Sequence, residues 1–252
     1  MYREQNVIYR YDGSFEGFLC CVFESVYQKE IPFSILPLDF PLLSLFPEKN
    51  IETRPDRAQR VFASFPKKLG PAAPSCIAHA FLSANPDKEL LLLRFLLLGY
   101  QKGPAVMHMA GHADVAPVLE MEKQVTGEAH QFTGFLRFCD YGDFLGSVIT
   151  PKNYVLPLLR LHFCQRFPSE NFMIYDSTHQ AALISRQCKT EYIQLCQPPE
   201  FPEQSPEETE FQELWKQFYK TIAIAARENQ NLRRSNCPKR YWVNMTELSS
   251  ER

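Results

Sequence analysis

Residues 7–27 read VIYRYDGSFEGFLCCVFESVY, and this stretch carries the clearest structural signals in the chain. Residues 7–11 alternate in the manner of a short strand. Asp12-Gly13-Ser14 then provides a turn and side-chain oxygens that can cap the start of a helix. From Phe15 to Tyr27, apolar residues recur with the i, i+3, i+4, i+7 spacing of an amphipathic helix. The stretch therefore predicts a strand followed directly by a helix.

The remainder of the first 104 residues is predicted to be mainly helical. Four prolines between residues 31 and 47 exclude a continuous helix there. Leu90–Tyr100 is very apolar but far too short to span a bilayer, and Arg94 interrupts it, so we expect a buried helix. The helices expected in this region are 56–65, 75–83 and 87–100.

The rest of the chain, residues 105–252, mixes helices with short aromatic or β-branched segments. Turn residues bound these segments, which is typical of a meander of antiparallel strands. The predicted strands are 132–138, 144–150, 172–175, 181–185 and 192–195, and the predicted helices are 106–125, 154–167 and 206–228. The expected fold class is α+β, with a mainly helical N-terminal region packed on a region with a short-stranded antiparallel sheet and a long C-terminal helix. The two regions can belong to one continuous domain.

Composition bounds the environment of the protein. The 252 residues carry a net charge of −2, and the first residues contain no apolar stretch of signal-peptide length. We therefore expect a soluble cytoplasmic protein with no membrane contact. The eight cysteines include no C-x-x-C pair, so we expect reduced thiols and neither a cluster nor another cofactor. Neither a P-loop nor a G-x-G-x-x-G occurs to cradle a nucleotide.

Two groups of polar residues could support acid–base chemistry or anion binding. Glu128 lies two residues before His130, where a carboxylate could orient an imidazole. His162 and Arg166 are four residues apart on a predicted helix and could hold an anion together. The alternatives are a helix-end hydrogen bond and an internal salt bridge. His108 and His112 also have a helical spacing, but no general-base glutamate lies between them, and we predict no metal site.

The most cationic stretch is RENQNLRRSNCPKRYW, residues 227–242, with five cations and one acid. Its cations could contact phosphates, its amides could contact phosphates or base edges, and Tyr241 and Trp242 could stack on bases. The alternative is a solvated surface. The predicted nucleic-acid contacts are Arg137, Arg166, Arg227, Asn229, Arg233, Arg234, Lys239, Arg240, Tyr241 and Trp242.

Five motifs occur in order along the chain: YDGSFEGFL, GEAHQFTGFLRF, HFCQRFPSENFMIYD, LWKQFYKTIAIAARENQ and CPKRYWVNMTEL. Together they resemble a bacterial family of SAM-associated proteins assigned to DNA metabolism or repair. That family contains a domain of unknown function, which is also found joined to uracil-DNA-glycosylase-like proteins. The resemblance covers nearly the whole chain and is most specific from about residue 85 onward. The matching polar residues are Asp12, Glu128, His130, Arg137, His162, Arg166, Asp176, Lys216, Arg227, Asn229, Lys239, Arg240 and Glu247.

The resemblance implies a DNA-repair or DNA-modification protein that acts with a radical SAM protein encoded nearby and binds DNA or a damaged nucleotide. Two alternatives remain. The protein could be a non-catalytic interaction subunit that docks this partner through residues 31–47 and aromatic surfaces. It could also be an acid–base hydrolase or lyase that uses Glu128, His130 and His162.

Overall fold

The structure is a computed structural model of the chain, and it describes residues 2–41 and 44–248. The chain divides into two compact units, residues 1–125 and 126–252, which we call unit 1 and unit 2. The division falls within helix α6 (Ala116–Phe135). This helix contributes Val118 and Met121 to the core of unit 1, and Ala129 and Phe132 to the core of unit 2. The boundary expected near residue 104 stays a prediction.

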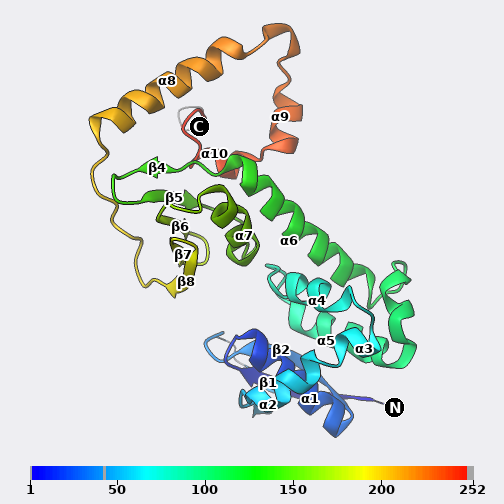
Figure 1. The fold of residues 1–252 in the computed structure, drawn as a ribbon. Coiled ribbons are helices and arrows are strands. Elements are labelled where there is room, and N and C mark those ends of the chain that lie inside the picture. The colour runs from blue at the N-terminus through cyan, green and yellow to red at the C-terminus, as the bar shows by residue number, and fades with distance from the viewer. Residues whose placement is uncertain (1, 42–43, 249–252) are drawn as a thin grey trace. The chain divides into compact units, whose positions relative to one another are not determined.

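Unit 1 begins with a three-stranded parallel sheet in the order β2-β1-β3 (Figure 1). Its strands are β1 (Arg3–Tyr11), β2 (Glu30–Pro37) and β3 (Glu48–Asn50). Helix α1 (Phe15–Gln28) connects β1 to β2, and the Ser14 hydroxyl caps it by accepting a hydrogen bond from the Gly17 N–H. The strand and helix predicted from residues 7–27 are confirmed. The sheet was not expected, because β2 lies in the proline-rich stretch. Residues 42 and 43 of that stretch lie outside the described residues.

The remaining helices of unit 1 surround a large apolar core. They are α2 (Pro55–Phe62), α3 (Phe65–Lys68), α4 (Ala73–Phe81), α5 (Lys88–Lys102) and the 3-10 helix η1 (Gly103–His108). Lys88–His108 is the one described segment that is long and apolar enough to cross a membrane by length and composition. Leu92, Leu93 and Phe95 of this segment are fully buried among other apolar side chains of unit 1. A core helix of a folded protein has the same properties, as the sequence predicted.

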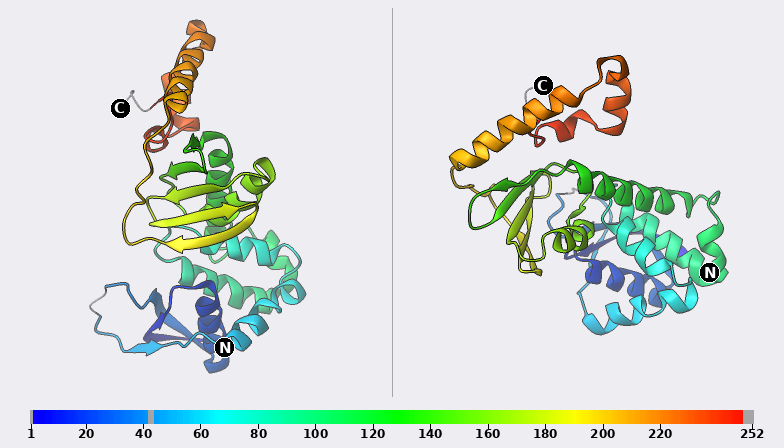
Figure 2. Two further views of the ribbon diagram at one scale, coloured as in Figure 1. Left: turned by 60° about the vertical axis from the view of Figure 1, so that its left-hand side comes forward. Right: turned by 45° about the horizontal axis from the view of Figure 1, so that its top comes forward.

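Unit 2 contains a five-stranded sheet in the order β4-β5-β6-β7-β8 (Figure 2). Its strands are β4 (Cys139–Asp140), β5 (Leu145–Ile149), β6 (Phe172–Asp176), β7 (Ala181–Arg186) and β8 (Lys189–Gln194). The sheet is mixed, whereas the prediction was an antiparallel sheet. Strands β5 and β6 are parallel because helix α7 (Leu156–Arg166) crosses over between them. The α+β fold class is confirmed.

The strand predicted at 132–138 is wrong, because α6 continues to Phe135. Ala129, Phe132 and Leu136 follow a helical spacing and enter the core of unit 2 together with α7 and the sheet. The helix expected at 106–125 instead begins at Ala116, with Pro117 in its first turn, where proline is tolerated.

The chain ends in a helical arm, which we define as residues 205–248. It contains α8 (Pro206–Ile222), η2 (Ala225–Arg227), α9 (Gln230–Asn236) and α10 (Lys239–Trp242). The long helix expected from Pro206 is therefore confirmed, although it ends at Ile222, before the predicted end at Glu228. Figures 1 and 2 show α8 standing off the sheet, while α10 returns to α6. Tyr241 of α10 packs against Phe132 and Phe135 of α6.

Candidate nucleic-acid interface

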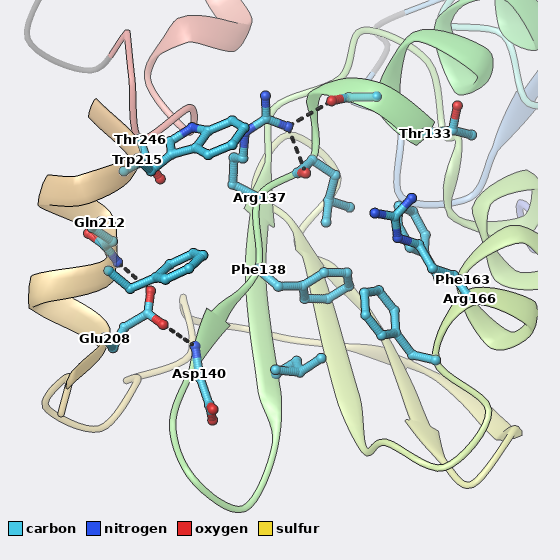
Figure 3. Close-up of a pocket in the computed structure, with 15 residues that line it drawn as sticks. Thr133, Arg137, Phe138, Asp140, Phe163, Arg166, Glu208, Gln212, Trp215 and Thr246 are labelled. Atoms are coloured by element: carbon cyan, nitrogen blue, oxygen red, sulfur yellow. Dashed lines mark hydrogen bonds between the residues drawn. The ribbon is translucent and has the colours of Figure 1, made fainter. Parts of the chain in front are cut away.

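A cleft of about 630 Å³ opens in unit 2 between the β4 edge of the sheet and α8 (Figure 3). Its walls come from the ends of α6 and α7, from the residues around β4 and from α8. The Phe138 ring lies edge-on to the rings of Phe163 and Phe167, at centroid distances of 5.4 and 5.3 Å. Phe211 and Trp215 of α8 line the opposite wall. The cleft is therefore largely aromatic.

Helix α8 forms this wall with little apolar packing, although Tyr219 packs against the small apolar cluster that contains Trp242. None of its side chains is buried, although its N-terminus is capped by the Ser205 hydroxyl, which accepts a hydrogen bond from the Glu208 N–H. The Glu208 carboxylate accepts a hydrogen bond of 3.2 Å from the Asp140 N–H, which joins α8 to the sheet edge. Most helical stability in proteins comes from tertiary packing and not from intrinsic propensity. The contacts between α8 and the rest of unit 2 therefore hold this wall of the cleft in place.

The strongest of these contacts is a cluster of Arg137, Glu247 and Trp215. The Glu247 carboxylate accepts hydrogen bonds from Arg137 Nη2 at 2.6 Å, Arg137 Nε at 3.3 Å and Trp215 Nε1 at 3.0 Å. Arg137 Nη1 also donates to the Gly134 carbonyl. The predicted phosphate contact Arg137 is thus held by an internal carboxylate, and its guanidinium joins α6, α8 and the C-terminal turn.

The hydrogen bonds of this cluster also set the charge of Glu247. Burial by itself raises the pKa of Glu247, but the hydrogen bonds from Arg137 and Trp215 outweigh that effect and hold the pKa below its ordinary value. Glu247 is therefore ionised at neutral pH. The cluster is a buried ion pair that positions Trp215 at the cleft.

Arg166 is the cation of the cleft that remains available. It is exposed at the end of α7, and Figure 3 shows its guanidinium extending towards the side of the cleft where Arg137 lies. Its guanidinium carbon lies 5.7 Å from the centre of the Phe167 ring. No carboxylate of residues 2–41 and 44–248 lies within ion-pair distance of it. An anion bound in the cleft could therefore reach Arg166.

A second cavity, of about 930 Å³, lies between the end of α8 and α9. Lys220, Arg227 and Arg233 line it together with Asn229. The Asn229 side chain caps α9 by accepting a hydrogen bond from the Leu232 N–H, so its oxygen is already used. The predicted contacts Arg227 and Arg233 therefore share a cavity, whereas Asn229 has a structural role there.

The charge of the arm changes sharply along its length. Residues 216–242 contain seven cations and one carboxylate, in a chain whose net charge is −2. Within the described part of the chain, Arg227, Arg234 and Lys239 have no ion-pair partner. This segment is the cationic surface of unit 2.

Two predicted contacts are wrong in their expected role. Tyr241 and Trp242 are almost completely buried, so their rings cannot stack on bases. Tyr241 packs on α6, and the Trp242 indole donates to the Cys237 carbonyl. The guanidinium of Arg233 lies 4.6 Å from the centre of the Trp242 ring. Accessible aromatic surface in this part of unit 2 includes Phe211, which lines the cleft and is 65% exposed. Phe211 and Trp215 could have been found from the helical spacing of apolar residues in α8, none of which is buried.

Glu128 does not form a catalytic group with the two predicted histidines. It is buried, and its two oxygens accept hydrogen bonds from the Lys152 and Asn153 N–H groups, from the Asn153 amide and from the Tyr241 hydroxyl. His130 is exposed, and residues two apart on a helix do not share a face. The carboxylate thus ties α10 to the loop after β5, which is a structural role.

The remaining candidate residues, His162, Cys139, His108 and His112, do not form a catalytic or metal site at the cleft. His162 packs edge-on against Phe163, and its Nε2 atom is buried without a hydrogen-bond partner. Burial raises the pKa of the nearby Cys139 thiol to about 11, so this thiol is protonated at neutral pH and is not a nucleophile. His108 ends η1, and His112 lies in the turn beyond it, so they do not share a helix face. The described residues contain no group of three or more potential metal ligands.

The fold and the site together define an α+β protein with an aromatic cleft beside a cationic helical arm. The family model for DUF4130, a domain of unknown function, matches residues 86–247, which is more than half of the chain. The chain therefore belongs to the DUF4130 family. No curated protein and no solved structure matches it.

Proposed function

We propose that unit 2 binds single-stranded DNA, with bases in the aromatic cleft and phosphates along the cationic arm. The observation that carries this proposal is the combination of the Phe211 and Trp215 rings at the cleft with cations that have no ion-pair partner among the described residues, namely Arg166, Arg227, Arg234 and Lys239. Proteins that bind single strands use these two components, because every base has a π-face and every linkage has a charge. Bases inside a duplex are stacked on one another and could not enter the cleft.

The cellular role that we propose is repair or modification of DNA in the cytoplasm of a bacterium, together with a radical SAM protein. The support is the resemblance of the five motifs to the SAM-associated family, together with the cationic arm. A cluster-bearing partner would supply the radical chemistry, while this chain would hold the strand.

Salt dependence measures how many cations contact phosphates. If Arg166, Arg227, Arg234 and Lys239 all do so, the log–log slope of the binding constant against salt is about −2.8 for a single strand. Affinity would then fall by about fifty-fold between 50 and 200 mM salt. Replacing Arg227, Arg234 and Lys239 with Ala would leave one contact and a slope of about −0.7.

The test is fluorescence anisotropy with a labelled single-stranded oligonucleotide and with its duplex. The matched control replaces three exposed cations of unit 1, Lys67, Lys68 and Lys102, with Ala. We expect tighter binding of the single strand, a weakened slope in the arm variant and a wild-type slope in the control. Equal slopes in the two variants, or binding independent of salt, would refute the proposal.

Exposed apolar side chains favour a second function, docking of a partner protein. Leu214, Phe218, Ile222, Ile224 and Leu232 of the arm are each more than half exposed. The expected result for an interaction subunit is co-purification with the neighbouring radical SAM protein, loss of that complex in Leu214→Ser/Phe218→Ser and no binding of DNA. Retention of the complex by this double variant would count against docking through α8.

A further inference from the structure

A second polar cluster lies in unit 2 where the parallel strands β5 and β6 end. In sheets with parallel strands, ligands bind outside the carboxyl ends of those strands. Strand β5 ends at Ile149 and leads into Thr150, while β6 ends at Asp176 and leads into Ser177. The two hydroxyl oxygens of Thr150 and Ser177 lie 3.1 Å apart, so the two strand ends are in direct contact.

Asp176 and His179 form a pair at this edge. The Asp176 side chain is fully buried, and Oδ1 accepts hydrogen bonds from the N–H groups of Thr178 and His179. Its other oxygen, Oδ2, lies 2.6 Å from His179 Nδ1. An ionised carboxylate accepts and does not donate, so this contact places a proton on Nδ1 and leaves the lone pair of the neutral imidazole on Nε2.

The imidazole is held in place but remains accessible. Its side chain is 28% exposed, and no described residue is hydrogen-bonded to Nε2. The Tyr154 ring packs edge-on against it at 5.4 Å, and the Gln194 amide donates a hydrogen bond to the His179 carbonyl. A buried carboxylate that orients an imidazole whose second nitrogen faces solvent is the arrangement of a general base.

A residue of the loop after β5, Lys152, and a residue of the arm, Arg240, both contact the buried Glu128 carboxylate. Lys152 is exposed, and its N–H donates to Glu128 Oε1. Arg240 Nη2 lies 3.5 Å from the same oxygen, and the Arg240 side chain is half exposed. The Asn244 amide donates to Thr150 Oγ1 at 2.8 Å, which fixes α10 and the turn after it to the end of β5. Lys152 therefore lies on the loop that also carries Tyr154, the ring beside His179, whereas Arg240 lies on α10 and is paired with Glu128.

We infer that the Asp176–His179 pair hydrolyses phosphodiester bonds, with Lys152 and Arg240 holding the phosphate. The inference rests on the proposed function, because the substrate is the bound single strand. His179 Nε2 takes a proton from water while the water oxygen bonds to phosphorus. The bond from phosphorus to the leaving oxygen breaks, and this oxygen takes the proton from the imidazolium. The products are one strand ending in a phosphomonoester and one ending in a hydroxyl group.

The experiment incubates the full chain with a 5′-fluorescein-labelled single-stranded oligonucleotide, in magnesium buffer and in EDTA, and resolves the products on a denaturing gel. We expect shortened labelled strands with the wild type. General-base catalysis contributes about 10²- to 10⁴-fold, so His179→Ala should reduce the rate by at least about a hundred-fold. Asp176→Asn should also reduce it, because an amide no longer enforces the Nδ1–H tautomer. His108→Ala, an exposed histidine of unit 1, is the matched control and should cleave at the wild-type rate.

Cleavage by His179→Ala at the wild-type rate would overturn the inference, as would absence of cleavage by the wild type in both buffers. Anisotropy with the same oligonucleotide separates the two proposals. If the wild type binds the strand without cutting it, the hydrolytic inference fails and the binding function stands. If it neither binds nor cuts, both fail.

Discussion

The cluster of Arg137, Glu247 and Trp215 should dominate the stability of the helical arm. The Glu247 side chain is only 3% exposed, and Arg137 supplies two of the three hydrogen bonds that its carboxylate accepts. Removing one partner of a buried ion pair costs about 3–5 kcal/mol, because the remaining charge is left uncompensated. The Arg137 side chain is 25% exposed, so water can partly replace it. We therefore expect Arg137→Ala to lower the free energy of unfolding by about 3 kcal/mol.

Urea-induced unfolding followed by tryptophan fluorescence measures this cost directly. The two tryptophans of the chain, Trp215 and Trp242, both lie in the arm. With an m-value of about 2 kcal/mol/M, the expected loss lowers the midpoint by about 1.5 M. The control is Lys216→Ala, which breaks an exposed ion pair with Glu213 and should leave the midpoint unchanged. Equal midpoints for the two variants would refute the assignment of stability to the cluster.

The same cluster predicts a dependence on pH. The folded state holds the pKa of Glu247 below its ordinary value of 4.5. The stability from this shift is fully present above pH 4.5 and is lost as the pH falls through the lowered folded value. Glu247→Gln cannot titrate, so the difference in stability between wild type and variant should shrink in that range. A difference that stays constant down to the acid limit of the assay would contradict this account.

Three further substitutions have expected outcomes. Gly17→Ala in α1 should destabilise unit 1 by about 1–3 kcal/mol in thermal unfolding, although alanine favours helices, because its Cβ would overlap the Asp12 carboxylate. Glu128→Ala should cost at least about 3 kcal/mol, measured from tryptophan fluorescence in urea, because it removes the carboxylate that accepts hydrogen bonds from Lys152 and Asn153. Burial raises the pKa of Glu89, so Glu89→Gln should stabilise the protein at pH 7 while still accepting the Tyr11 hydrogen bond. That gain should shrink as the pH falls through the raised folded value, and a gain independent of pH would refute it.

The elements with a strong local pattern were predictable. The helix over residues 15–27, the helix at 87–100 and the strands at 144–150, 172–175 and 181–185 have a periodicity that depends only on neighbouring residues. The segment 132–138 has the same aromatic texture but is mostly helical. It continues a helix that begins at Ala116, and its apolar side chains bury against α7 and the sheet. Local propensity is weak compared with that packing.

The candidate site was less predictable than the fold. The cations of residues 227–242 could be identified from composition. Which aromatic side chains are accessible to bind bases beside these cations depends on burial, which the sequence does not give. Tyr241 and Trp242 lie beside the cations in the sequence and face the core, whereas Phe138 and Trp215 come from other segments and line the cleft. The approach of His179 to Asp176 depends on the turn between β6 and β7. No pattern in the sequence predicted the conformation of this turn.

The sequence alone determined the α+β class, the long amphipathic helix near the end of the chain and the positive charge of the segment that follows, because periodicity and charge are properties of neighbouring residues. The tertiary structure alone decided that the sheet of unit 2 is mixed, that Glu247 neutralises Arg137 and that Asp176 orients His179. Each of these depends on how segments distant in sequence, or the two ends of a turn, are brought together. Burial and pairing follow from that packing and not from the order of residues in the chain.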